Sequence, residues 1–143
     1  MGLKRLTHVR PEVTPETSVL DTVRVMAEAE IGAIAVMAGS KIVGLFTERD
    51  LLKRVVAKRL DPATTTMKDV MTSSLVTVLD TTSVAKAADT MRGRRMRHLV
   101  IVDQEGTYLG MLAQRHLLYD LMNELSMKVD DLAGYLMTDG PGG

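Results

Sequence analysis

The segment best suited to chemistry is Thr47-Glu48-Arg49-Asp50, which directly follows a strand-length apolar run and begins a helix. One interpretation is structural: a threonine at the N-cap with an acid three residues later is a common helix start, and Asp50 also favours the helix dipole. The other is functional, because an accessible carboxylate at a helix N-terminus can accept hydrogen bonds from both hydroxyls of a ribose. The two interpretations are compatible.

A second segment, Arg92-Gly93-Arg94-Arg95-Met96-Arg97-His98, holds four arginines and a histidine. Arg92 and Arg94 fit a solvated helix end, where cations complement the C-terminal dipole. Arg97 and His98 begin an apolar strand, and we expect at least one of them to bind phosphate. Nucleic acid is an unlikely partner, because the segment lacks interleaved aromatic residues and the chain has no broad positive charge.

The composition argues against several classes of protein. The 143 residues hold 18 Lys+Arg against 18 Asp+Glu and no Cys, which removes disulfides, thiolate metal sites and a cysteine nucleophile. Apolar runs are shorter than the roughly 20 residues of a membrane span, and the N-terminus lacks a secretory profile. We therefore expect a cytoplasmic protein without a membrane partner. Common enzyme motifs are missing, and His8, His98 and His116 lack metal-ligand spacing, so we expect neither catalysis nor a metal.

The elements that must position these segments occur twice, about 65 residues apart. Three stretches return in the same order: 13–19 as 78–84, 33–37 as 98–102, and 44–52 as 110–118. Such a self-match indicates an internal duplication, and two copies of a small unit can bury a shared face and leave clefts between them. Polar positions that differ between the copies are the best candidates for function.

Each copy has the pattern helix, strand, strand, helix, which predicts an α/β (α+β) fold. Apolar runs at 33–37, 42–46, 99–102 and 108–112 predict two hairpins whose strands are buried on both faces by flanking helices. The second helix of each copy begins near Thr47 or Ala113, and 67–71 forms a short helical turn. An apolar stripe at helical spacing continues to about Met137, so a long C-terminal helix is the best candidate for an oligomer contact.

At this point the pattern resembles a known family. The duplicated unit, with Gly-hydrophobic-x-Thr-x-x-Asp ending its second strand, is similar to a CBS domain, and two in tandem resemble a Bateman module of the stand-alone type. The resemblance covers about residues 6 to 122. It gives unit 1 at 6–60, unit 2 at 67–122, a helix extension at 123–137 and a flexible tail at 138–143. It implies a pseudo-twofold arrangement with two clefts, each able to bind an adenosine-containing ligand.

The resemblance implies one intact cleft and one degenerate cleft. In the intact cleft, Thr47 and Asp50 would hold ribose, other residues would surround adenine, and a basic pair would meet phosphate. The remaining ligand-binding candidates are Phe46, Met71, Ser74, Val76, Met96, Arg97 and His98. In the second cleft, threonine and aspartate are replaced by Ala113 and His116. Gly32 and Ala33 stand where the basic pair would be, and Ile31 precedes them in the same cleft. A neutral histidine cannot copy a bidentate carboxylate, so one good site per chain is expected.

These observations predict a non-catalytic regulatory module whose ligand is AMP, ADP or ATP, with NAD(H) as an alternative in the same cleft. Binding would favour one orientation of the two units and pass that bias to an unidentified regulated protein or to a homodimer mate. A different hypothesis is a structural interaction module without nucleotide, in which Thr47 and Asp50 only cap a helix. The chain is either a whole protein or a piece of a longer one.

Overall fold

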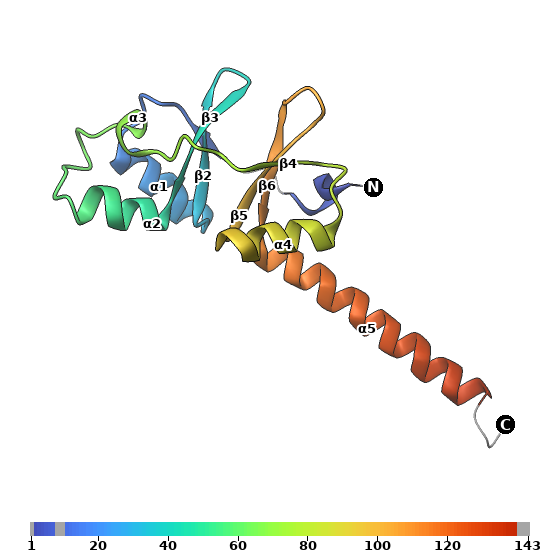
Figure 1. Ribbon diagram of the computed structural model, residues 1–143. Helices are drawn as coiled ribbons and strands as arrows, with labels where there is room; N and C mark the ends of the chain where they lie inside the picture. Colours follow the sequence, from blue (N-terminus) through green and yellow to red (C-terminus); the bar gives the residue numbers. More distant parts are fainter. Residues whose placement is uncertain (1, 8–10, 140–143) are drawn as a thin grey trace.

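The computed structural model describes residues 2–7 and 11–139 and contains two similar units in tandem (Figure 1). His8 and residues 140–143 of the predicted tail lie outside the described residues. The N-terminal 3-10 helix η1 spans Leu3–Leu6. The helices and strands of unit 1 are β1 Glu12–Val13, α1 Val19–Ala29, β2 Ala33–Ala38, β3 Lys41–Thr47, α2 Glu48–Asp50 and the π-helix η2 Leu51–Val56. A short helix, α3 Met67–Val70, leads into unit 2, which consists of β4 Thr77–Leu79, α4 Val84–Arg94, β5 His98–Val102, β6 Tyr108–Ala113 and α5 Gln114–Asp139.

Each unit has one three-stranded sheet, in the orders β1-β2-β3 and β4-β5-β6. The predicted hairpins are confirmed: β2 pairs antiparallel with β3, and β5 with β6. The short parallel strands β1 and β4 were not predicted, because two or three residues are too few to show a period of two. Both hairpins shift register at the equivalent place, between Val36 and Met37 and between Ile101 and Val102.

The first helices of the two units are built by the same local signals. Ser18 and Ser83 are the N-caps of α1 and α4, and each side chain accepts a hydrogen bond from the backbone three residues later. Both helices end at a residue in the left-handed conformation, Glu30 with φ 55° and Arg95 with φ 54°. The duplication therefore extends to the caps.

The core has three parts, and its middle part corrects one prediction. Ile34, Val36 and Phe46 pack with α1 in unit 1, and an equivalent cluster fills unit 2. The other face of β2 is not covered by flanking helices as expected: Ala33 and Ala35 pack in a third cluster that includes Met111 of the opposite sheet. The small alanine side chains allow the two sheets to approach, so each sheet has helices on one face and the other unit on its second face.

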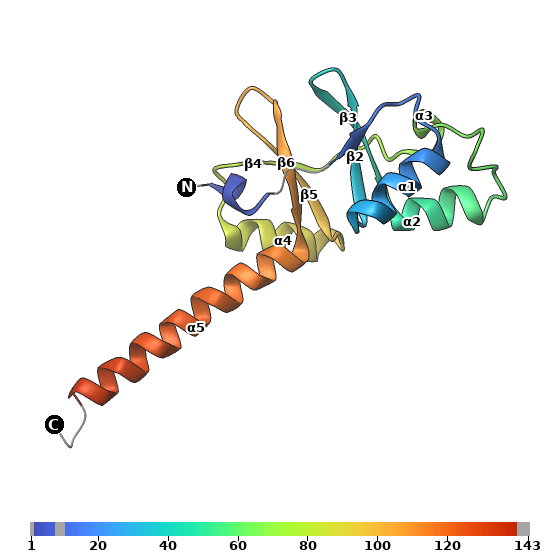
Figure 2. The same ribbon diagram turned by 180° about the vertical axis from the view of Figure 1, so that it is seen from behind.

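The segment that leads into each unit crosses the sheet of the other unit. The lead into unit 2 forms an isolated bridge, in which the Leu45 N–H donates to the Thr72 carbonyl at 2.9 Å and the Thr72 N–H donates to the Leu45 carbonyl at 2.8 Å. Met71 lies directly against Gly44 of β3, and Thr7 lies against Gly110 of β6 in the equivalent position. The two units are thus tied together by an exchange of their leads (Figure 2).

Candidate functional site

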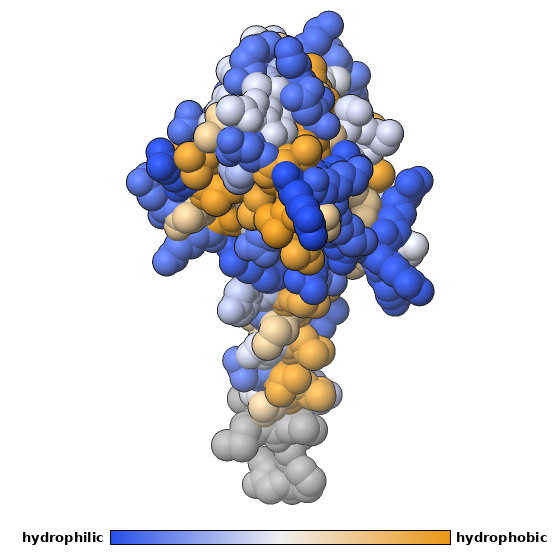
Figure 3. All heavy atoms as spheres, turned by 90° about the vertical axis from the view of Figure 1, so that its left-hand side faces the viewer, coloured by the Kyte–Doolittle hydropathy of each residue, from blue (hydrophilic) through white to orange (hydrophobic). Residues whose placement is uncertain are grey.

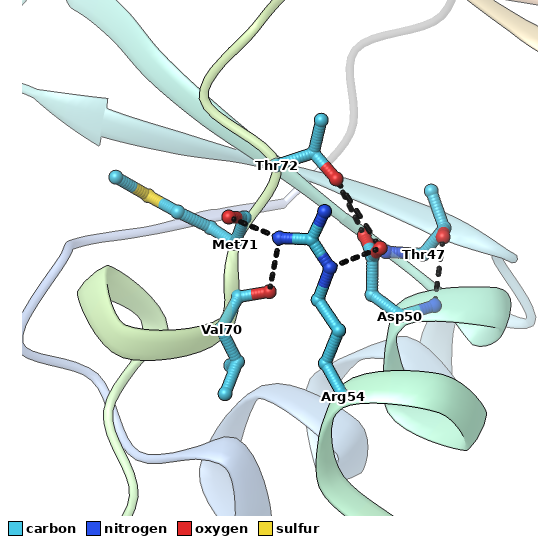
Figure 4. Close-up of polar contacts among 6 residues, drawn as sticks. All are labelled: Thr47, Asp50, Arg54, Val70, Met71 and Thr72. Carbon is cyan, nitrogen blue, oxygen red and sulfur yellow. Dashed lines mark hydrogen bonds and ion pairs between the residues drawn. The ribbon is translucent and has the colours of Figure 1, made fainter.

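The carboxylate of Asp50 is buried at the junction of β3 and α2 (Figure 4). Its Oδ2 accepts from the Thr47 backbone N–H at 3.0 Å, while the Asp50 N–H donates to Thr47 Oγ1 at 3.2 Å, which completes a capping box. The Thr72 hydroxyl lies 3.2 Å and 3.3 Å from the two carboxylate oxygens and donates to them from the lead into unit 2. The carboxylate therefore combines the cap of α2 with a contact between segments 22 residues apart.

Arg54 provides a cation for this carboxylate. Its Nε lies 3.5 Å from Asp50 Oδ1, and its Nη1 donates to the Met71 carbonyl at 3.0 Å and to the Val70 carbonyl at 3.4 Å. Arg54 lies in η2, where π-helical bonds such as Ala57 N–H to the Leu52 carbonyl widen the turn. Single π turns inside helices often mark functional sites. The guanidinium thus joins Asp50 to the backbone that leads into unit 2.

The predicted ligand-binding residues fall into separate groups. Thr47, Asp50 and Met71 lie together around Arg54, as Figure 4 shows. The side chain of Phe46 is in the unit 1 core and is fully buried, whereas Val76 packs on the core of unit 2 and Ser74 is exposed. A direct side-chain contact of Phe46 with a ligand in the cleft would therefore require the core to open.

The predicted phosphate residues line two hollows at the junction of the units. In a hollow of about 350 Å³, Arg97 and His98 of unit 2 face Gly32 and Glu48 of unit 1. A second hollow of about 500 Å³ is bordered by Met96 and by four arginines, which are Arg49, Arg92, Arg95 and Arg97. Arg97 borders both hollows. Asp50 lines neither hollow, and its carboxylate is covered by Thr72 and Arg54.

The degenerate cleft has a different junction. Ala113 is buried and lines the smaller hollow with Gly32, while Ala33 is fully buried between the sheets and Ile31 packs on the unit 1 core. His116 is half-buried in the first turns of α5. Alanine offers no side-chain acceptor at the start of α5, so the reciprocal cap of Thr47 and Asp50 has no counterpart here.

Three functional candidates were missed by the sequence analysis: Arg54, Thr72 and Arg49. Thr72 follows Met71 in the lead that was assigned to adenine, so its proximity to the cleft was available from the pattern. Arg54 could be found only from the structure, because its distance to the 70–71 carbonyls depends on how η2 packs against the lead. Arg49 was given no role of its own in the 47–50 helix start, yet it borders the larger hollow.

The described residues contain neither a metal-binding cluster nor a membrane-spanning helix. In residues 2–7 and 11–139, no three His, Asp or Glu side chains come together as metal ligands. Over the same residues, no helix combines the length and apolarity that crossing a bilayer requires.

The chain belongs to the CBS domain family, whose model matches residues 7–57 and again residues 67–123. The CBS domain-containing protein CBSCBSPB3 of Arabidopsis thaliana is 29% identical over 128 residues, which is 87% of this chain and 23% of that protein. The chain thus spans about a quarter of this relative's length.

Solved structures agree with this assignment. A protein with CBS domains from Burkholderia ambifaria superposes with a TM-score of 0.79 at 27% identity, over 86% of this chain and 95% of that chain. A CBS domain protein of Pyrobaculum aerophilum complexed with AMP superposes with a TM-score of 0.71 at 30% identity, over 86% of this chain and 99% of that chain. The tandem CBS fold is therefore shown for this chain, and a relative of nearly the same extent binds AMP.

Proposed function

We propose that this chain is a non-catalytic regulatory module that binds an adenine nucleotide, AMP, ADP or ATP, between its two CBS units. The observation that carries the proposal is the buried carboxylate of Asp50, which lies at a helix N-terminus between unit 1 and the lead into unit 2. The AMP complex of the Pyrobaculum relative supports the class of ligand. A cytoplasmic location remains a prediction from the sequence.

Ribose binding would use the same carboxylate oxygens that the protein now occupies. Both oxygens accept from Thr72, and Oδ1 is also paired with Arg54. Two vicinal hydroxyls can donate to a carboxylate in the same way, whereas the Thr47 backbone N–H can keep its bond to Oδ2. A bound ribose would therefore displace Thr72 and Arg54 without dismantling the helix cap.

The phosphate would be bound by the arginines at the junction of the units. Arg97 borders both hollows, and Arg49 and Arg95 border the larger one, so cations from both units converge there. Arg92 is already paired with Asp89 at 2.6 Å and contributes less free charge. His98, which follows Arg97 in the chain and lines the smaller hollow with it, is the second phosphate candidate.

Arg54 would transmit occupancy. Its Nη1 donates to the carbonyls of Val70 and Met71, which belong to the segment that carries unit 2. When ribose takes its place at Asp50, this arginine loses its ionic partner, and its bonds to the lead weaken or rearrange. The orientation of the two units would then shift toward the state that binds the ligand better, which a regulated protein or dimer mate can sense.

One observation favours a second function, a structural interaction module without nucleotide. Both oxygens of the Asp50 carboxylate are already partnered by Thr47, Thr72 and Arg54, and the carboxylate lies outside both hollows. In that case the polar cluster only stabilises the junction. NAD(H) as ligand is a variant of the first proposal, and the same experiment addresses it.

Thermal unfolding with AMP, ATP, NAD and GTP tests the proposal. A ligand at 100 times its Kd should stabilise the protein by about 2.7 kcal/mol, a Tm shift of several degrees. Arg97→Ala should weaken binding at least about tenfold, because charged hydrogen bonds contribute roughly 1.5–3 kcal/mol. Arg94→Ala is the matched control, since Arg94 is exposed at the end of α4 and borders neither hollow.

Arg97 is the better probe because Asp50 also caps α2, so replacing Asp50 alters apo stability as well. An adenine-selective shift that Arg97→Ala reduces and Arg94→Ala preserves supports the nucleotide module. A Tm shift with NAD but not with AMP or ATP would identify NAD as the ligand. No shift with any of the four would contradict nucleotide binding and favour the interaction module.

A further inference from the structure

The C-terminal part of α5 extends away from the two units. Figures 1 and 2, which view the molecule from opposite sides, both show this helix projecting from the body with no other element beside its end. Every residue from 122 to 135 is exposed. The CBS domain match ends at residue 123, so most of this projection lies beyond the family's domain. A helix without packing partners is only marginally stable in water, and this one also contains Val129 and Gly134, which have low helix propensity.

One side of the projecting helix is apolar with a heptad spacing. The residues of this seam alternate at steps of four and three, and each exposes between 50% and 64% of its surface: Leu118, Met122, Leu125, Val129 and Leu132. In heptad terms leucine occupies each d position and Met122 and Val129 occupy the a positions. Figure 3 shows apolar atoms running along one side of this helix beneath the body, with hydrophilic atoms on the other.

We propose that the seam is the dimer interface of the protein and that a second copy of the chain covers it as a parallel two-stranded coiled coil. Leucine at each d position, with the β-branched Val129 at one of the two a positions, favours two parallel strands. A seam whose apolar residues alternate at spacings of four and three residues can pack against an identical seam. A second copy of the chain is therefore enough to bury it. This inference does not depend on nucleotide binding.

The residues beside the seam are compatible with a pair of identical helices. Among the flanking e and g positions from 119 to 135, the charged residue is Lys128, and in a parallel pair it faces Ala133 of the second copy. The pair therefore places no like charges opposite each other. Tyr119 and Tyr135 flank the seam, are 64% and 62% exposed, and can cover its edges.

The available area is sufficient for association. With half or more of each side chain exposed, the five seam residues offer on the order of 500 Å² per chain, so a pair reaches the roughly 1,000 Å² of a specific interface. Burial of the seam would also supply the tertiary stabilisation that the helix lacks. The parallel arrangement brings the two bodies to the same end, where a change in one module can affect the other.

Light scattering on the full chain, over a range of protein concentrations, tests the proposal. Wild type should be a dimer, and Leu125→Asp should be monomeric, because two carboxylates would enter the seam. Met127→Asp is the matched control: Met127 is 66% exposed against 64% for Leu125, yet it lies at f on the outer side, so this variant should remain dimeric. Circular dichroism should show a loss of helix in Leu125→Asp and not in Met127→Asp.

Orientation is tested by a single introduced cysteine, which is clean because the chain has none. Leu132→Cys should form an interchain disulfide on oxidation, since the two copies of a d position meet only in a parallel pair. A monomeric wild type, equal behaviour of Leu125→Asp and Met127→Asp, or a higher oligomer would overturn the proposal. A dimer that survives Leu125→Asp would place the interface elsewhere, for example at the exposed side chains of Leu52 and Val56.

Discussion

The two units place a polar residue at the same position of their second helices, and each uses it to bind the lead that crosses the unit. In unit 1 this residue is Arg54, which donates to the carbonyls of Val70 and Met71. In unit 2 the equivalent position is Asp120, which pairs with Arg5 of η1 at 2.8 Å. Both contacts hold a lead against a helix, but only the first also reaches an acidic group at a helix N-terminus.

This difference shows how a duplicated fold can divide its tasks. Ser18 and Ser83, the left-handed ends of α1 and α4, and the register shifts of the hairpins are the same in both copies. These features build the scaffold that the two copies share. The junction after the last strand of each unit, β3 or β6, differs between the copies. It has a capping box and a π-helix in unit 1 and a long α-helix in unit 2. Unit 1 has a buried carboxylate there, and unit 2 has a projecting helix.

The largest expected effect tests whether the two lead crossings are equivalent. A Cβ at Gly110 would lie 2.9 Å from Thr7 Cβ, and Gly110 has φ +153°, so Gly110→Ala should destabilise by about 3 kcal/mol. Gly44→Ala meets the flexible side chain of Met71 and should cost about 1–2 kcal/mol. Chemical denaturation measures both values.

Gly93→Ala is the control for these glycine substitutions. It lies in α4, and apart from its chain neighbours and the backbone of its own helix no atom is within 4 Å of its Cβ position, so alanine should raise stability by up to about 1 kcal/mol. If Gly44→Ala lowers the free energy of unfolding as much as Gly110→Ala does, the flexible Met71 side chain does not accommodate a methyl group better than the β-branched Thr7, which would contradict this prediction.

The next largest effect tests whether the junctions that contain Asp50 in unit 1 and His116 in unit 2 differ in stability and in ligand response. Asp50→Ala removes the capping box and the bond from Thr72, so unfolding free energy should fall by about 2 kcal/mol. His116→Ala, at the equivalent position of unit 2, should cost less than about 1 kcal/mol. The same denaturation experiment with AMP should show that Asp50→Ala loses the nucleotide response and His116→Ala retains it. If His116→Ala costs the more of the two, the polar junction is not specific to unit 1.

The smallest effect concerns the contact of unit 2 with its lead. The Arg5 guanidinium donates to the carboxylate of Asp120 and lowers its pKa below the ordinary value of 3.8. A lowered folded-state pKa gives stability that is present above the unfolded value and is lost as pH falls through the folded value. The Tm difference between wild type and Asp120→Asn should therefore be small at pH 7, begin to fall below about pH 4 and vanish only once the pH is below the lowered folded-state pKa. A difference that grows on acidification would contradict the ion pair.

Much of the fold could be predicted from the sequence because its signals are local and occur twice. The apolar runs gave both hairpins, the position of Thr47 gave the start of α2, and the apolar stripe gave the long helix. The short strands β1 and β4 were missed, since their pairing with β2 and β5 is made by tertiary contact and not by a local pattern. The burial of β2 by the opposite sheet also depended on how the alanines of one unit meet the other.

The sequence by itself determined the duplicated scaffold, the Thr-x-x-Asp junction of unit 1 and the apolar stripe of the last helix, because caps, periods and repeats are properties of neighbouring residues. Only the tertiary structure decided that Arg54 and Thr72 cover the Asp50 carboxylate and that Arg97 lines a hollow together with residues of unit 1. Those contacts join segments far apart in the chain, and their distances follow from how the two units pack, which no local pattern specifies.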